Sequence, residues 1–105
     1  MLQTRYTLAP DDSGAWRGLV TDLVVRCGQG DDSALAELYE LFHPLVGSLA
    51  VREAPDREVT AVVLDAFSRV WRRAGTFQPS VGSAVAWVLM ELSAAVSAQG
   101  AAARA

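Results

Sequence analysis

The fold is decided by residues 65–77, which read DAFSRVWRRAGTF. The apolar residues of this stretch and of the segment before it recur at helical spacings, and they are Val59, Val63, Ala66, Phe67, Val70 and Trp71. Gly75 then supplies a helix stop. The pattern predicts a helix over 57–74 with Asp56 as its N-cap and Glu58 favourable in its first turn.

Two more helices are expected on the N-terminal side. The first spans 15–27 and ends at the glycine-containing run 28–30; its apolar stripe is Trp16, Leu19, Val20, Leu23, Val24 and Cys27. The second spans 34–51 and follows the acidic capping run 31–33. Pro44 lies inside this second helix, which predicts either a kink or two abutting helices.

A last helix is expected to begin after Ser83 as its cap and to end near Ala98. Its main apolar stripe is Val85, Val88, Leu89, Leu92 and Val96. The fold class is therefore all-α, a small bundle of about four helices. We expect this domain over 15–98, with a flexible leader over 1–14 and a flexible tail over 99–105.

The composition suits one small domain in a reducing compartment. The chain has 105 residues, 51% of them hydrophobic, and a single cysteine, Cys27, which excludes an internal disulfide. No apolar run reaches the ~18 residues of a membrane span, and the N-terminus lacks a secretory signal pattern. We therefore expect a cytoplasmic protein that does not contact a membrane.

The residues that carry chemistry are sparse. One histidine, His43, and one cysteine, expected in the core, cannot build a zinc site of four protein ligands. The carboxylates are spread over helix caps and faces, with no acid and base brought together. We expect no metal, no cofactor and no enzymatic activity.

Three stretches together resemble one family. They are GDDSALAELY at 30–39 with HPLV at 43–46, the stretch 65–77, and FQPSVGS at 77–83 with AWVL at 86–89. In order and spacing they resemble region 2 of the extracytoplasmic-function sigma factors of the sigma-70 family. The resemblance implies a stand-alone, degenerate sigma region 2 without region 4, the part that reads the −35 element.

The resemblance implies that the helix over 57–74 docks on the clamp of RNA polymerase. The residues expected to contact polymerase or another regulatory partner are Asp65, Ser68, Arg69, Arg72 and Arg73. Where the family has an acid and a glutamine, this chain has Ala61 and Leu64, which weakens the contact or makes it drier. Helical spacing places Asp65, Arg69, Arg72 and Arg73 on one exposed face; the alternative is an Asp65–Arg69 pair worth about 0.3–0.5 kcal/mol.

The resemblance also implies that the following loop holds a flipped base of the −10 promoter element. Candidate residues for residual DNA binding are Thr76, Phe77, Gln78, Ser80 and Ser83. The structural alternative is that Phe77 fills the core and Pro79 stiffens a turn. That alternative is favoured, because no arginine lies between 83 and 98 to bind phosphates and the only charge there is negative.

The last helix is apolar nearly all round, so it needs burial on more than one side. Trp87 and Met90 point away from its main stripe and are candidates for an apolar interface with a partner or a second copy, although a tryptophan at this spacing also suits a core. Three functions follow. The first is that the chain regulates transcription through protein contacts, with promoter reading lost and DNA binding by the chain alone weak or absent. The second is that it is one subunit of a two-part sigma factor that still takes part in −10 binding. The third is that it binds an anti-sigma factor or a second copy of itself.

Overall fold

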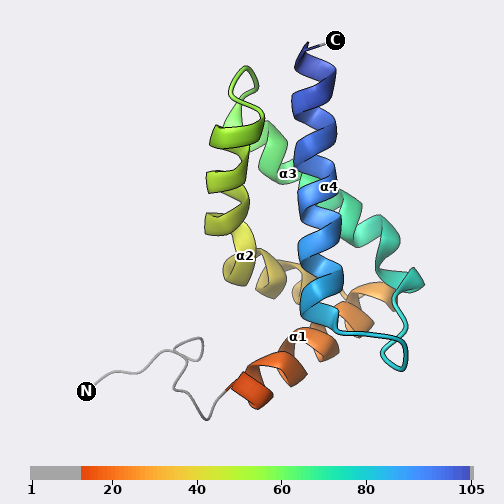
Figure 1. Ribbon diagram of the computed structural model, residues 1–105. Helices are drawn as coiled ribbons and strands as arrows, with labels where there is room; N and C mark the ends of the chain where they lie inside the picture. The colour runs from red at the N-terminus through yellow and green to blue at the C-terminus, as the bar shows by residue number, and fades with distance from the viewer. Residues whose placement is uncertain (1–12, 105) are drawn as a thin grey trace.

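The computed structural model describes residues 13–104, and within that range it contains helices and no strand. The helices, drawn in Figure 1, are α1 (Ser13–Gly28), α2 (Asp32–Glu53), α3 (Val59–Arg73) and α4 (Ala84–Arg104), with a short 3₁₀ turn, η2 (Ala74–Thr76), after α3. The all-α expectation of about four helices is confirmed. Each of the four α-helices contacts the other three, so they pack around one shared core.

The core is built from the stripes that helical spacing predicts. Helix α1 contributes Val20, Leu23, Val24 and Cys27, all nearly or fully buried. Helix α2 contributes Ala34, Leu38, Phe42, Val46 and Ala50; α3 contributes Val62, Val63, Ala66, Phe67 and Val70; α4 contributes Val88, Leu92, Ala95 and Val96. Removing this apolar surface from water supplies most of the driving force for folding.

A polar network joins the end of α1 to the start of α2. Gly30 adopts a φ of 89°, which a residue with a side chain rarely tolerates, and lets the chain reverse. The Asp31 carboxylate caps α2 by accepting from the Ser33 backbone N–H at 3.0 Å, and its other oxygen accepts from Arg26 Nε at 2.9 Å. Hydrogen bonds from Ser33 and Arg26 hold the pKa of Asp31 below its usual range.

Helix α2 is continuous through Pro44. Of the two alternatives, one bent helix or two abutting helices, the chain forms a single helix, and Figure 1 shows it changing direction near its middle. Proline removes one backbone donor and crowds the preceding turn, which bends a helix without necessarily ending it.

The start of α3 differs from the expectation. Glu58, not Asp56, is the N-cap, and its Oε1 accepts from the Thr60 backbone N–H at 3.0 Å. Because the helix begins two residues later than predicted, Val59 lies at its exposed end, with 38% of its surface accessible. Val62, which the predicted stripe omits, is buried in its place.

The predicted end of the last helix is also wrong. Helix α4 continues to Arg104 instead of ending near Ala98, because the segment is rich in alanine, the strongest helix former. A hydrogen bond of 3.1 Å from Ser97 Oγ to Glu53 Oε1 ties this upper part of α4 to α2. At the other end α1 begins at Ser13, and the rest of the predicted leader, 1–12, lies outside the described residues, as does residue 105.

The end of α1 lies directly against the turn that follows α3. A Cβ atom added to Gly28 would lie 3.1 Å from the carbonyl oxygen of Ala74 and 3.1 Å from the backbone of Gly75. The two backbones therefore touch with no side chain between them. This contact fixes η2, and with it the first residue of the loop that leads to α4.

Candidate functional site

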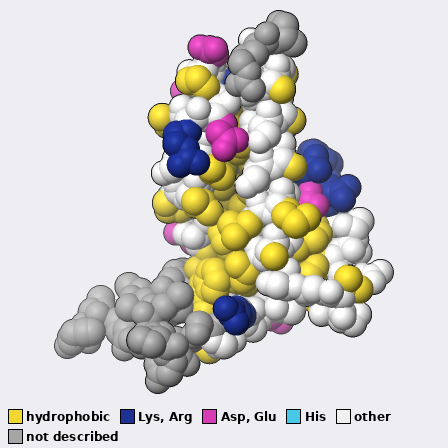
Figure 2. Space-filling view, in the orientation of Figure 1, with side chains coloured by type: hydrophobic (Ala, Val, Ile, Leu, Met, Phe, Trp, Pro, Cys, Tyr) yellow, Lys and Arg dark blue, Asp and Glu magenta, His cyan; other side chains and the backbone are white. Residues whose placement is uncertain are grey.

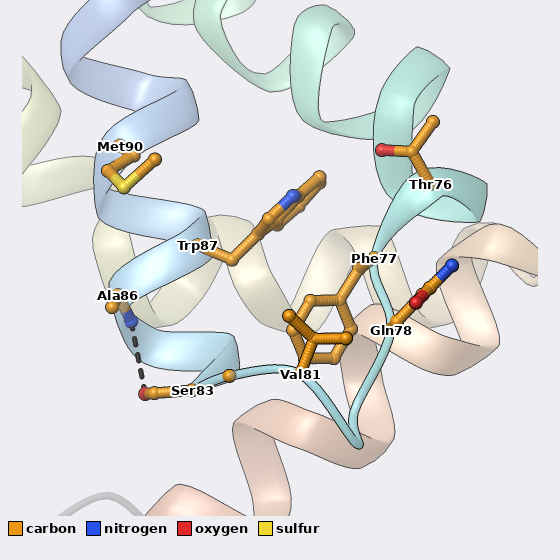
Figure 3. Close-up of a pocket in the computed structure, with 9 residues that line it drawn as sticks. Thr76, Phe77, Gln78, Val81, Ser83, Ala86, Trp87 and Met90 are labelled. Carbon is orange, nitrogen blue, oxygen red and sulfur yellow. Dashed lines mark hydrogen bonds between the residues drawn. The ribbon is translucent and has the colours of Figure 1, made fainter.

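The loop between η2 and α4 borders an open cavity of about 450 Å³, which we call the loop cavity (Figure 3). It is lined by Thr76, Phe77, Gln78, Val81, Gly82, Ser83, Ala86, Trp87 and Met90. Two groups of predicted residues, those for DNA and those for an apolar interface, therefore meet at one place. Ser80 is the exception, because it is exposed and does not line the cavity.

Two aromatic side chains form a wall of the loop cavity. The ring centroids of Phe77 and Trp87 lie 5.7 Å apart with the planes tilted by 53°. Both residues are half-buried and pack against the core while also lining the cavity. Phe77 and Trp87 therefore both pack against the core, as the structural alternative expected, and both also expose part of the ring to the cavity. Such a wall suits an apolar or planar group.

Most of the polar groups around the loop cavity are used by the backbone. Thr76 Oγ1 donates to the Arg73 carbonyl oxygen at 2.6 Å. Ser83 Oγ accepts from the Ala86 backbone N–H at 3.2 Å, which confirms Ser83 as a cap of α4. Figure 3 marks this bond. Gln78 has an exposed amide that makes no such bond and can form hydrogen bonds with a polar ligand. The cavity therefore selects its ligand mainly by shape.

The residues of α3 that are expected to contact a partner are divided between two edges of the helix. Arg69 Nε and Arg73 Nε both donate to the same oxygen, Oε1 of Glu91 on α4, at 2.8 and 2.9 Å. Ser68 instead lies on the α2 side. Of the four charged residues predicted to share one exposed face, Arg69 and Arg73 are therefore held against α4 by Glu91, while Arg72 is exposed. No ion pair joins Asp65 to Arg69 within residues 13–104, so the alternative pairing is wrong.

Glu91 is the residue that the sequence analysis missed. Its side chain is only 8% exposed, and it carries the sole charge of α4 before Arg104. A buried carboxylate needs a cationic partner, which is a usable signal. The partners lie 22 and 18 positions away, however, and helical spacing gives no information about contacts at that separation.

A second hollow, the α2–α3 groove, lies on the opposite edge of α3. It has a volume of about 380 Å³ and is lined by Asp32, Leu35, Ala36, Tyr39, Glu40, Leu64, Phe67 and Ser68. Leu64 is 57% exposed, unusually open for a leucine. Two exposed carboxylates, Asp32 and Glu40, stand at its rim, and no cationic side chain lines it. The groove suits an apolar partner segment that carries positive charge.

Aromatic stacking stiffens the wall of this groove. The rings of Tyr39 and His43 are stacked, with centroids 4.7 Å apart and planes 8° from parallel. Tyr39 also contacts Phe67, with centroids 5.1 Å apart. His43 is therefore half-buried against a tyrosine, in agreement with an ordinary packing role. A rigid wall lowers the entropy cost of docking a partner.

No described residues are arranged for metal binding, since 13–104 contain no group of three or more histidine, cysteine or acidic side chains suited to it. Burial raises the pKa of the Cys27 thiol to about 11, so the reactive thiolate form is suppressed. Cys27 is a core residue, as expected.

Helix α4 is long and apolar enough by composition to cross a membrane, contrary to the expectation that no segment would be, and it is the one described helix that passes this test. The core helix of a compact domain passes it equally, and Val88, Leu92 and Val96 of α4 face the bundle interior. The compact helical fold is compatible with a soluble protein.

Comparison with known proteins returned nothing: no family model, no curated protein and no solved structure matches the chain.

Proposed function

We propose that the chain is a cytoplasmic, sigma region 2-like regulatory protein that acts in transcription through protein contacts. Its partner is the clamp of RNA polymerase or another regulatory protein. The α2–α3 groove is the observation that carries the proposal. It adjoins the helix to which the resemblance assigns polymerase docking, and it includes Leu64, the residue that replaces the family's glutamine.

The chemistry of the groove supports a basic, amphipathic partner. Leu64 is exposed beside an apolar floor, so a partner can bind there through hydrophobic contacts, which require no fixed direction. Accessible apolar surface of this kind marks protein interfaces. The carboxylates of Asp32 and Glu40 at the rim, with Asp65 half-buried nearby on α3, favour a partner that carries arginine or lysine. Carboxylates of this kind pair with arginine through two parallel hydrogen bonds.

Capture of purified core polymerase tests the proposal. Leu64→Glu places a charge in the groove and is expected to lower capture by about tenfold or more, the effect typical of a central interface residue. Val51→Glu is the matched control, because Val51 is equally open at 60% and lies on α2 outside the groove. Asp65→Arg is expected to weaken capture as well. If polymerase is not captured at any of the salt concentrations tested, polymerase is not the partner.

The loop cavity favours a second candidate, a subunit of a two-part sigma factor that still takes part in −10 binding. Its aromatic wall can stack against a planar base, an interaction that single-strand-binding proteins use widely. A fluorescent −10 single strand separates the candidates. Binding that Trp87→Ala abolishes and Trp16→Ala leaves intact supports the second candidate, and no binding supports the first.

An apolar surface favours self-association or an anti-sigma factor as partner. Val81 and Met90 of the loop cavity are 78% and 66% exposed. Figure 2 shows further hydrophobic side chains gathered over the face formed by α1, α2 and α4. Sedimentation of the purified chain measures self-association directly. A monomer at all concentrations that binds no apolar dye argues against both forms of this candidate.

A further inference from the structure

Helices α3 and α4 are joined by one ionic cluster within the described part of the chain. Arg69 and Arg73 approach Glu91 with the same atom, Nε, and both bonds end on the same carboxylate oxygen. Two guanidinium groups are therefore held side by side at fixed distances of 2.8 and 2.9 Å from one point.

The cluster keeps a positive charge and presents it outward. Two cations and one anion leave a net charge of +1. The arginine side chains are 36% and 47% exposed, whereas that of Glu91 is 8% exposed. An approaching ion meets the guanidinium groups before it meets the carboxylate. Figure 2 shows basic side chains gathered beside an acidic one on the flank where α3 emerges beside α4.

The two arginines have donors to spare. Each uses only Nε for Glu91, and the N–H groups on its two terminal nitrogens have no partner among residues 13–104. A guanidinium presents these groups as a planar fork that matches an oxyanion. Because Glu91 already fixes both arginines, less side-chain freedom is lost when an anion binds.

We propose that Arg69 and Arg73 form a binding site for a phosphate-type oxyanion, presented by the shared bond to Glu91. The phosphate belongs to a free polyphosphate or to the backbone of a nucleic acid strand, which offer the same oxygens. Arg72 is exposed on the same helix and makes no bond to Glu91, so it adds attraction at a distance but no fixed geometry. The site lies on the opposite edge of α3 from the α2–α3 groove, and its test does not require polymerase.

Titration of the full chain at low salt with two probes tests the site. Tripolyphosphate represents the free anion, and a fluorescent abasic oligonucleotide represents a strand backbone without bases. Arg69→Gln and Arg73→Gln are each expected to weaken binding by about tenfold, whereas Arg72→Gln, the matched loss of one charge, weakens it by about twofold. Each single variant leaves Glu91 one arginine partner, so the fold is retained, as a thermal melt verifies.

Arg73→Lys separates geometry from charge, since lysine keeps the charge and loses the planar fork. The site predicts that this variant also binds about tenfold more weakly, and full retention would contradict it. Binding of one probe alone identifies the source of the phosphate, and binding of both supports the shared chemistry. If neither probe binds, or if Arg72→Gln weakens binding as much as Arg73→Gln, the proposal is wrong.

Discussion

The two edges of α3 differ in how they satisfy their polar and apolar groups. Towards α4, the edge is charged, and its arginines Arg69 and Arg73 are held by a buried carboxylate. Towards α2, the edge is apolar and open, with Leu64 exposed and carboxylates left at the rim. The comparison teaches that one helix can contribute to stability on one edge and present a docking surface on the other. Substitutions on the α4 edge should therefore lower the free energy of unfolding, whereas substitutions on the α2 edge should change it little.

The largest effect is expected where the charged edge is broken completely. The double variant Arg69→Gln/Arg73→Gln leaves the Glu91 carboxylate buried without a cation. We expect a loss of about 2–4 kcal/mol in the free energy of unfolding, at the lower end of buried-pair effects because both arginines are partly exposed. Urea denaturation with an unchanged m-value measures it. Adding Glu91→Leu should restore most of the loss, and a double variant as stable as Arg72→Gln would contradict the cluster's structural role.

A smaller contrast separates the buried side of α3 from the groove edge. Val70 is 0% exposed, and Val70→Ala should cost about 2 kcal/mol through lost burial and a cavity. Leu64→Ala removes more atoms but from an exposed position, so the loss should stay within about 0.5 kcal/mol. The same urea series tests both. Equal losses would show that Leu64 is a packing residue and would weaken the docking proposal.

The start of α4 positions the charged edge, and it depends on a cap. Ser83→Ala removes the hydroxyl that accepts from the Ala86 backbone N–H, at an expected cost of about 1 kcal/mol. Ser80→Ala removes an exposed serine of the same loop that makes no such bond, and its expected effect lies within about 0.5 kcal/mol. Thermal melts of the pair suffice. Identical melting temperatures would show that the capping bond adds nothing.

The smallest effect concerns acid at the start of α2, beside the groove. Because the pKa of Asp31 is lowered in the fold, its contribution to stability is present above the ordinary aspartate pKa and is lost as the pH falls through the lowered value. Asp31→Asn should therefore melt below the parent at neutral pH, with the difference shrinking in acid. Asp56→Asn, in an exposed turn, is the control. A difference that does not depend on pH would argue against an ionic role for Asp31.

Apolar spacing predicted the helices and most of the core, because burial within a helix repeats with the helix period. Apolar spacing failed at the ends of helices, where capping residues and helix propensity decide the boundary. Alanine extended α4 past Gly100, and Glu58, expected only as a favourable residue of the first turn, caps α3 in place of Asp56.

The candidate sites were predictable only in part. The loop cavity combines residues that lie close in sequence, and most of them were named in advance. The division of α3 into two edges depends on Glu91 and on α2 residues such as Leu35 and Tyr39, which meet α3 only in the folded bundle. Contacts between segments far apart in the chain leave no periodic trace in a single sequence.

The backbone contact at Gly28 has a consequence for genetics. In a library of all single substitutions, position 28 should be among the less tolerant glycines, since even the Cβ of alanine requires the backbone of Ala74 and Gly75 to move back by a few tenths of an ångström. Gly18 and Gly47, which have open space around them in helix interiors, should accept alanine and even be enriched for it. Gly28 is thus the place to seek a temperature-sensitive allele of this protein, one that loosens the loop cavity without altering any residue that lines it.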